Sequence, residues 1–356
     1  MRHLPTIDNI DFSENAMVVL DVRSITQLLY MHSVVGHLFF EKKIILIWKG
    51  KESDLIKASE LIDIPEDHYI LDINSQDKSL ILNFNNIRKI RSICRSIYTP
   101  FRKIQILTSY ASGMYFELLK STLLVDDDDI VQFDDGLANE IVEINRYRFL
   151  RLIIYLMHNF YHFPSKYRLF SDYRFKKIYT SINPKNIIGI KDKKIVDISN
   201  CVSKNFKKIS LNCLSIINSQ SAILMSTHSV ESKRMTRQQY QKLIEAVYLK
   251  LKEAGAMDVY LSKHPTEKNS NDEFYRKIGL ILTYHNIPSE LLVANKNINY
   301  IANPINSTII ISAYLEQLNG IQGVVSYIPS KSVHEKERVD IIKKILLDRS
   351  IKHSIF

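Results

Sequence analysis

The chain has little glycine and little proline, with 9 residues of each type among 356. Neither G-x-G-x-x-G nor G-x-x-x-x-G-K occurs, so the fingerprints of dinucleotide-binding and P-loop proteins are absent from the sequence. The same scarcity excludes a collagen-like chain and a long flexible linker. A glycine-rich phosphate loop is therefore not part of this protein.

Cysteine is scarcer still, and the three residues of this type are Cys94, Cys201 and Cys213. They show no CxxC spacing and cannot all pair, so we expect buried thiols and a reducing compartment. Asp8, Asp11 and Glu14 interrupt the N-terminus, which argues against a signal peptide. The sequence contains no run of about 18 uncharged apolar residues, so we expect no helix that spans a bilayer. We expect a cytoplasmic protein, with peripheral contact to the inner face of the cytoplasmic membrane as a second expectation.

Basic charge, by contrast, is abundant. The 48 Lys and Arg outnumber the 38 Asp and Glu, which gives a net charge of +10 and an isoelectric point near 9.2. Such an excess attracts nucleic acid, an acidic lipid surface or an anionic sugar polymer, and charge alone does not choose among them. With 46% apolar and 24% charged residues the chain is globular, and it is long enough for two domains.

Apolar runs typical of buried strands alternate with stretches of helical periodicity along the first 133 residues. The predicted strands are 16–20, 43–48, 69–73, 104–107 and 130–133, and the predicted helices are 25–35, 54–61, 83–97 and 110–124. This alternation predicts an α/β domain with a parallel sheet and helices on both faces.

The second half of the chain starts less clearly. We predict a helix from 146 to about 162 and a β-prone, turn-rich region over 187–218, with the interdomain connection near 205–218. A second α/β unit follows. Its predicted elements are strands 222–225, 258–262 and 323–327, a helix that begins at 236, and a last helix over 333–348. The sequence thus predicts an N-terminal Rossmann-like domain over 1–212 and a C-terminal one over 213–356, with the last helix packing back on the first domain.

One stretch of the C-terminal half carries chemistry at a strand end. The run that ends at residue 262 leads directly into Lys263-His264-Pro265, which places a basic pair at the carboxyl edge of a sheet, where open α/β sheets bind ligands. Ser307 and Thr308 precede an apolar run that resembles a helix start, and a hydroxyl-capped helix N-terminus binds anions. Each feature alone is more often a structural one.

A carboxylate lies between these two features. Glu290 follows Pro288-Ser289 and is expected to open a short helix near the same edge. A cation, a carboxylate and a hydroxyl-capped helix together suit a ribose phosphate.

An acidic turn follows the strand predicted at 130–133. Asp134 and Asp135 precede Gly136, which permits the sharp bend that would aim a carboxylate into a cleft. Adjacent side chains on an extended backbone face opposite ways, so one of the two carboxylates points inward. Without further information, an Asx-turn at a strand end explains the pair equally well.

The order Asp-Asp-Gly, then Lys-His-Pro, then Ser-Thr resembles the bacterial sialyltransferases, which carry an acidic-acidic-Gly motif, an HP motif and a paired Ser/Thr motif. The likeness is greatest to the polysialyltransferase and multifunctional groups, in which an acidic residue also lies between the last two motifs. It covers four short motifs spread over roughly half of the chain. Thr308 departs from the Ser found in many members but keeps the hydroxyl.

The resemblance implies two Rossmann-like domains facing a central cleft, the glycosyltransferase-B type. It also implies inverting transfer of sialic acid from CMP-sialic acid, with no metal and no other cofactor. The roles that it implies are Asp135 as base with Asp134 and Gly136 in support, and His264 as the group that hydrogen-bonds or protonates the CMP phosphate. Pro265, Ser307 and Thr308 would lie at the phosphate, and Glu290 at the ribose. Lys263 either supports His264 with its charge or simply points to solvent.

Two other features have competing interpretations. Residues 126–129 (DDDD) contain the D-x-D of metal-dependent glycosyltransferases of the other fold, but a solvated turn before a strand is the simpler explanation. Ser226-Thr227-His228-Ser229 ends the first strand of the C-terminal domain and should line the same cleft. It either contacts donor or acceptor or merely ends the strand.

A basic helix face bears on the acceptor. Arg88, Arg91 and Arg95 follow i, i+3, i+7 spacing and share one face. Such a stripe suits a polyanionic acceptor such as polysialic acid or the inner-leaflet surface, and a merely solvated face explains it as well. No nucleic-acid-reading module occurs in the sequence.

The resulting hypothesis is a sialyltransferase that acts on a sialylated or polysialic acid acceptor in capsule synthesis. The alternatives are a lipooligosaccharide mono-sialyltransferase, a CMP-Kdo transferase, and, outside the enzymes, a basic nucleic-acid-binding protein. The partners expected for the first hypothesis are CMP-sialic acid, an anionic glycan, and the inner-membrane surface or a capsule-export complex, without nucleic acid.

Overall fold

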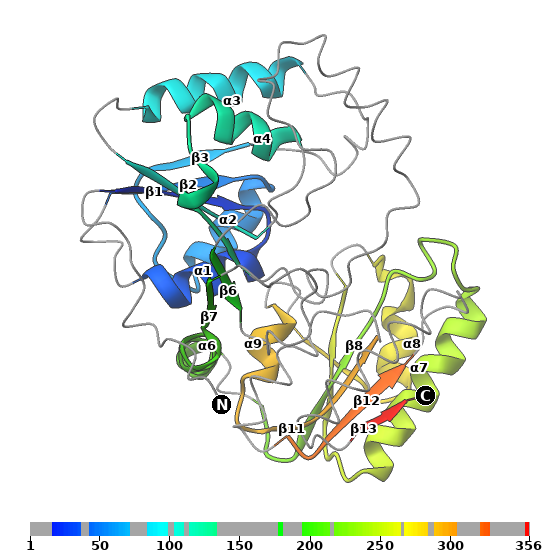
Figure 1. Ribbon diagram of the computed structural model, residues 1–356. Coiled ribbons are helices and arrows are strands. Elements are labelled where there is room, and N and C mark those ends of the chain that lie inside the picture. Colours follow the sequence, from blue (N-terminus) through cyan, green and yellow to red (C-terminus); the bar gives the residue numbers. More distant parts are fainter. Residues whose placement is uncertain are drawn as a thin grey trace. The chain divides into compact units, whose positions relative to one another are not determined.

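A computed structural model describes residues 16–36, 43–71, 84–98, 103–109, 114–133, 177–180, 194–213, 217–264, 267–283, 288–304, 321–327 and 353–355. The chain divides into two compact units, Met1–Val202 and Ser203–Phe356. This division and the predicted boundary after residue 212 both fall inside one helix, α6 (Ser199–Cys213). Each unit is built on its own sheet of parallel strands (Figure 1).

The sheet of the first unit runs in the order β3-β2-β1-β4-β5-β6-β7, and all neighbouring strands are parallel. Its strands are β1 (Met17–Val22), β2 (Ile44–Trp48), β3 (His68–Ile70), β4 (Ile104–Thr108), β5 (Ile130–Phe133), β6 (Lys177–Thr180) and β7 (Lys194–Asp197). The helices before α6 are α1 (Ile25–Val35), α2 (Glu52–Ser59), α3 (Phe84–Ile97) and α4 (Met114–Thr122), and the short η3 (Asp127–Asp129) precedes β5.

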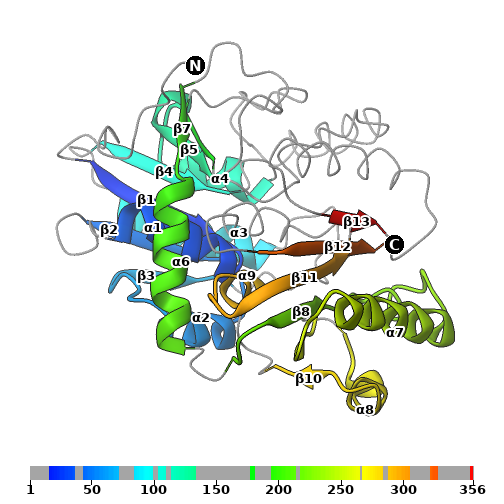
Figure 2. The same ribbon diagram turned by 90° about the horizontal axis from the view of Figure 1, so that it is seen from below.

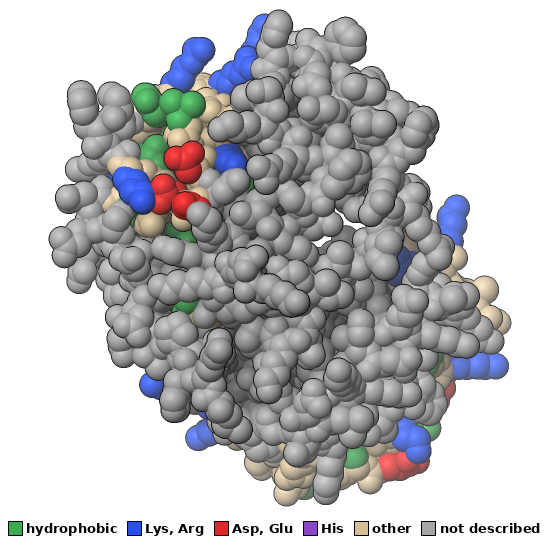
Figure 3. All heavy atoms as spheres, viewed as in Figure 1, with side chains coloured by type: hydrophobic (Ala, Val, Ile, Leu, Met, Phe, Trp, Pro, Cys, Tyr) green, Lys and Arg blue, Asp and Glu red, His purple; other side chains and the backbone are tan. Residues whose placement is uncertain are grey.

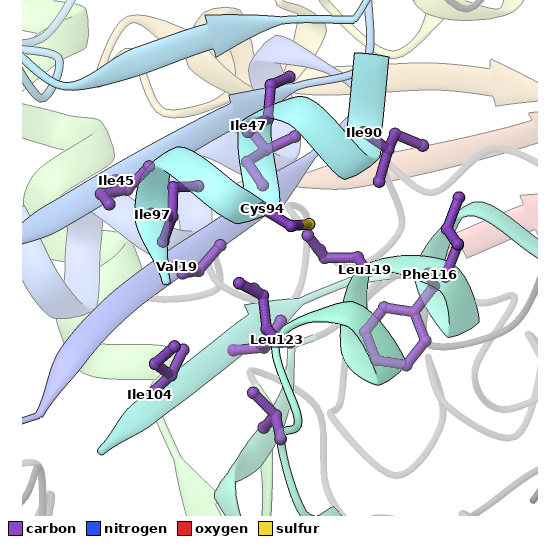
Figure 4. Close-up of a cluster of buried hydrophobic side chains, with 14 of the residues drawn as sticks. Val19, Ile45, Ile47, Ile90, Cys94, Ile97, Ile104, Phe116, Leu119 and Leu123 are labelled. Carbon is purple, nitrogen blue, oxygen red and sulfur yellow. The ribbon is translucent and has the colours of Figure 1, made fainter. Parts of the chain in front are cut away.

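Strands β1, β2 and β4 are buried along their whole length because helices cover both faces of the sheet (Figure 1). On one face, Ile90, Cys94 and Ile97 of α3 and Phe116 and Leu119 of α4 pack against alternate residues of the central strands (Figure 4). Burial raises the pKa of the Cys94 thiol to about 12, so this cysteine behaves as a small core residue.

The sheet of the second unit repeats the arrangement, with the order β10-β9-β8-β11-β12-β13 and parallel neighbours throughout. Figure 2 shows β13, β12, β11 and β8 in succession. The strands are β8 (Ser221–Met225), β9 (Val259–Ser262), β10 (Ile281–Leu282), β11 (Ile298–Pro304), β12 (Gly323–Tyr327) and β13 (His353–Ile355). The helices are α7 (Arg237–Glu253), α8 (Asp272–Lys277) and α9 (Ser289–Val293), and η5 (Asn269–Asn271) leads into α8.

The start of α7 is set by local sequence. The Thr236 hydroxyl accepts the N–H of Gln239, and the Gln239 side chain accepts the N–H of Thr236, which is a capping box. From there Tyr240, Ile244 and Val247 recur at helical spacing and join one core cluster with β8, β9, β11 and β12.

Most predicted elements are confirmed with shifted ends, but one prediction is wrong. Residues 199–213 form α6, whereas the sequence was interpreted as turn-rich there. Buried Ile198, Val202, Phe206 and Ile209 give this segment a helical period that its Ser, Asn and Cys residues obscure. Strands β6, β7, β10, β11 and β13 were not predicted individually. The helices predicted at 146–162 and 333–348 lie outside the described residues, and no described helix is both long and apolar enough to cross a bilayer.

Candidate functional site

In the second sheet the strand order reverses at β8. From β8 the chain moves outward to β9 and β10, and then returns to place β11 on the other side of β8. In open parallel sheets the ligand site lies outside the carboxyl ends of the strands at such a reversal. His228 follows β8 and His264 follows β9, while β11 ends at Pro304, shortly before the Ser-Thr pair of the sequence.

The two histidines contact each other. The ring centroids of His228 and His264 are 4.6 Å apart, with the planes inclined by 36°. Both residues are partly buried and partly open to solvent. Burial, and the His228 ring next to it, lower the pKa of His264, and the Glu231 carboxylate opposes this shift. The imidazole of His264 is therefore shifted toward its neutral form.

A buried hydrogen-bond network holds the backbone of His264. Its N–H donates to the Ser226 hydroxyl at 2.8 Å, and that hydroxyl donates to Glu267 Oε2. The other carboxylate oxygen of Glu267 accepts from the Tyr275 hydroxyl and, at 3.3 Å, from the Asn271 amide. Burial raises the pKa of Glu267, while the three donors and the nearby Lys263 act in the opposite direction. The three donors limit the rise in the pKa of Glu267 but do not reverse it.

The same network reaches the loop that carries His228. The Tyr275 hydroxyl lies 3.2 Å from the Tyr240 hydroxyl, which accepts the N–H of Thr227 at 3.1 Å. The Thr227 hydroxyl in turn accepts the N–H of Ser229 and contacts the Ser229 hydroxyl at 2.5 Å. His228 thus lies between two anchored residues, and a continuous buried chain of polar groups connects the supports of both histidines.

Lys263 has a structural partner. Its ammonium donates to Asn269 Oδ1 at 2.7 Å and forms an ion pair with Asp272 Oδ1 at 2.5 Å. Only 5% of its side chain is exposed, so its charge is compensated within the loop between β9 and α8. Lys263 fixes the segment that carries His264.

Glu290 lies in the first turn of α9, as predicted. The Ser289 hydroxyl is 2.7 Å from the hydroxyl of Ser262, the last residue of β9. Because His264 follows two residues later, the start of α9 and the HP motif lie at the same edge of the sheet. The structure therefore brings Glu290 and His264 to one end of one sheet.

The remaining motif residues lie outside the described part of the chain. They are Asp134, Asp135, Gly136, Pro265, Ser307 and Thr308. The strands before them are described, since β5 ends at Phe133 and β11 at Pro304. Their contacts stay predictions.

The predicted arginine face is present on α3. Arg88, Arg91 and Arg95 are exposed, and the apolar residues between them are buried. Figure 3 shows Lys and Arg side chains in blue at the top of the view, where Figure 1 draws α3.

The first sheet carries a different polar cluster near its carboxyl edge. Lys49, directly after β2, pairs with Asp21 of β1 at 2.5 Å, and Asp21 Oδ2 accepts the Thr108 hydroxyl of β4 at 3.0 Å. The two charged side chains are 1% and 2% exposed. Burial lowers the pKa of Lys49, and Asp21 opposes that shift.

Sequence reasoning missed Glu267, Tyr275, Tyr240 and the Asp21–Lys49 pair. A signal exists for the last one, since Asp21 interrupts the apolar run of β1. Glu267 is only three residues after His264. Nothing in the sequence connects it to Tyr240 or Tyr275, because those contacts form only when α7 and α8 pack on the sheet.

No protein-family model and no curated protein sequence matches the chain. Similar folds occur among solved structures. An alpha/beta-galactoside alpha-2,3-sialyltransferase from the luminous marine bacterium Photobacterium phosphoreum matches with a TM-score of 0.56 at 11% identity, covering 95% of this chain and 98% of that one. The chain has the glycosyltransferase-B fold.

Two epimerases have a similar fold as well. The UDP-GlcNAc 2-epimerase of Neisseria meningitidis matches with a TM-score of 0.53 at 13% identity, covering 94% of this chain and 90% of that one. The enzyme of the same name from Methanocaldococcus jannaschii gives 0.53 at 12%, with 93% of each chain covered. At these identities the likeness is one of fold.

Proposed function

We propose that this protein is a glycosyltransferase that moves sialic acid from CMP-sialic acid to a glycan hydroxyl, with inversion and without a metal. One observation carries the proposal: His264 emerges at the carboxyl end of β9, beside the reversal of strand order, with Glu290 at the same edge. The order of the acidic turn, the HP motif and the Ser-Thr pair, together with the glycosyltransferase-B fold, supports it.

In this mechanism Asp135 takes the proton of the acceptor hydroxyl as its oxygen attacks the anomeric carbon. The new carbon–oxygen bond forms on the face opposite the nucleotide, and the bond from that carbon to the phosphate oxygen breaks. CMP departs with the electron pair, so no metal is required to hold a diphosphate. An ionised carboxylate is the appropriate base at neutral pH.

His264 supports the departing phosphate. As a neutral imidazole it donates one N–H to a phosphate oxygen, and the developing negative charge favours its protonation. Ser307 and Thr308 contribute hydroxyls to the phosphate, and Glu290 accepts from the ribose hydroxyls. The arginine face of α3 is the proposed site for an anionic glycan acceptor, with polysialic acid of a bacterial capsule as the example, and for contact with the inner membrane surface.

The test is an assay of the full chain with CMP-sialic acid, without metal, on oligosialic acid and lactose-terminated acceptors. CMP-Kdo and UDP-GlcNAc serve as alternative substrates. Transfer from CMP-sialic acid is expected, and its rate should fall by about 10²–10⁴-fold in Asp135→Asn while CMP binding persists. Epimerisation of UDP-GlcNAc without transfer from either CMP sugar would refute the proposal, and full activity of Asp135→Asn would refute the assignment of the base.

A further inference from the structure

The His228 and His264 rings contact each other at the carboxyl edge of the second sheet. The His228 ring, whose centroid lies 4.6 Å from that of His264, opposes protonation of His264, and both rings are half-buried. The backbone of each loop is anchored by the buried network of Ser226, Glu267 and Tyr240. Burying a carboxylate and two tyrosine hydroxyls costs free energy, and hydrogen bonds only compensate it. Such a network is more typical of a positioned site than of a loop that merely ends a strand.

We propose that His228 and His264 form a two-imidazole clamp for the phosphate of the nucleotide, and that the clamp takes up protons when the phosphate binds. The identity of the nucleotide rests on the proposed function, whereas the pairing of the rings does not. Ser226-Thr227-His228-Ser229 then belongs to the donor side of the site.

The position of the two rings at the carboxyl edge of the sheet suits a nucleotide phosphate. The rings come from loops after two adjacent parallel strands, and the same sheet edge receives the end of β11. No group of three metal-ligating side chains occurs in the described part of the chain. A dianionic phosphate that accepts an N–H from the edge of each ring would favour protonation of His264, because that imidazolium would gain an opposite charge and a charge-assisted hydrogen bond.

Several charged side chains surround the two histidines, and most of them have partners of their own. Glu267 accepts from its three donors, and Lys263 is paired with Asp272. Glu231 accepts the N–H of Lys268 with one oxygen, and its negative charge raises the pKa of His264. The exposed Lys233 and Arg234 belong to the turn after His228, whose carbonyl accepts the N–H of Ser232 at 2.9 Å.

The sign of the pH effect follows from the protonation states. In the empty protein burial and the neighbouring ring lower the pKa of His264, so its ring is neutral at pH 8. The second pKa of a phosphate monoester is about 6, so CMP is already a dianion at that pH. Protons that enter the complex at pH 8 must therefore come to the protein. Affinity for CMP should rise as the pH is lowered from 8 toward 7.

The experiment is calorimetric titration of the full chain with CMP at pH 8, in two buffers of different ionisation enthalpy. The difference between the apparent enthalpies gives the number of protons taken up. Wild-type protein should take up a measurable fraction of a proton, up to two. In His228→Gln the uptake should fall by at least half and the affinity by about tenfold. His68→Gln is the matched control, because His68 lies at the amino end of β3 in the first unit and contacts the carbonyls of Pro65 and Glu66.

The outcomes separate this inference from the proposed function. If CMP binds wild-type protein without proton uptake, or if His228→Gln matches wild type in both quantities, the clamp is refuted while the sialyltransferase proposal stands. If UDP binds with His228-dependent proton uptake and CMP does not bind, the clamp is supported and the proposed donor is wrong. If His228→Gln fails to fold, CMP binding to the wild-type protein without proton uptake still refutes the clamp.

Discussion

The carboxyl edges of the two sheets use buried charge in opposite ways. The sheets have the same strand order over their first six strands, and in each the first strand lies beside the fourth. In the first sheet Asp21 pairs with Lys49 and accepts the Thr108 hydroxyl across three adjacent strands, and both charges are almost fully buried. In the second sheet the buried carboxylate of Glu267 supports two loops whose histidine rings stay half-exposed. The same topology thus yields a buried ion pair in one unit and a partly exposed pair of histidines in the other.

This contrast predicts a large stability effect at the buried ion pair. Lys49→Met removes the ammonium and leaves Asp21 buried without its counter-charge, which should lower the free energy of unfolding of the first unit by about 3–5 kcal/mol. Trp48, the single tryptophan of the chain, is buried next to Lys49, so its fluorescence follows the unfolding of this unit in urea.

Two further variants test the cause. The double variant Lys49→Met/Asp21→Asn should recover more than half of the loss, because no uncompensated charge remains. Lys57→Met is the matched control, since its partner Asp54 is 42% exposed and the pair is worth about 0–1 kcal/mol. Equal effects of Lys49→Met and Lys57→Met would show that the buried pair contributes no more than a surface one.

In the second unit, substitution of the buried Glu267 should lower enzyme activity more than thermal stability. In Glu267→Gln the amide can donate to the Ser226 hydroxyl instead of accepting from it, which disturbs the support of His264. We expect kcat/KM for the CMP-sugar donor to fall by about 10–100-fold, mostly through KM.

Glu273→Gln is the control for that variant, because Glu273 is exposed on the same helix, α8. Thermal denaturation of both variants should show similar, small shifts. A large loss of Tm in Glu267→Gln with unchanged KM in the folded fraction would identify Glu267 as a structural residue and not a positioning one.

The smallest effect is expected at the surface of the first unit. Arg88→Gln/Arg91→Gln/Arg95→Gln should raise KM for an oligosialic acid acceptor about fivefold at low salt, and less at high salt, because exposed charges are screened. The change in unfolding free energy should stay within about 0.5 kcal/mol. Removing three exposed charges elsewhere, with Lys242→Gln/Lys250→Gln/Lys252→Gln on α7, is the control. Equal KM values in both triple variants would leave the arginine face as a solvated surface.

Local patterns were sufficient for much of the fold. Strands such as β1, β2 and β8 are short apolar runs, and α7 has a helical period and a capping box, so each follows from neighbouring residues. Strand β11 was missed because its sequence INYIANP mixes polar residues into the run. It becomes a strand by pairing with β8 and β12, which are distant in the sequence.

The candidate site shows the same limit. His264 and Glu290 were predicted because each stands at the end or start of a recognisable element. The role of Glu267 could not be predicted, since its partners Ser226 and Tyr275 belong to β8's end and to α8. Lys263 was expected either to add charge at the site or to point to solvent, and its pairing with Asp272 depends on how the loop folds back.

Residue order alone therefore established two α/β units, the positions of their central strands and the strand end that carries His264, because hydrophobic periodicity and strand-end chemistry act over a few residues. Tertiary structure decided that His228 contacts His264, that Glu267 supports both loops, and that Asp21 and Lys49 neutralise each other. These facts depend on which strands become neighbours, since a buried polar group must find its partner across the fold and not along the chain.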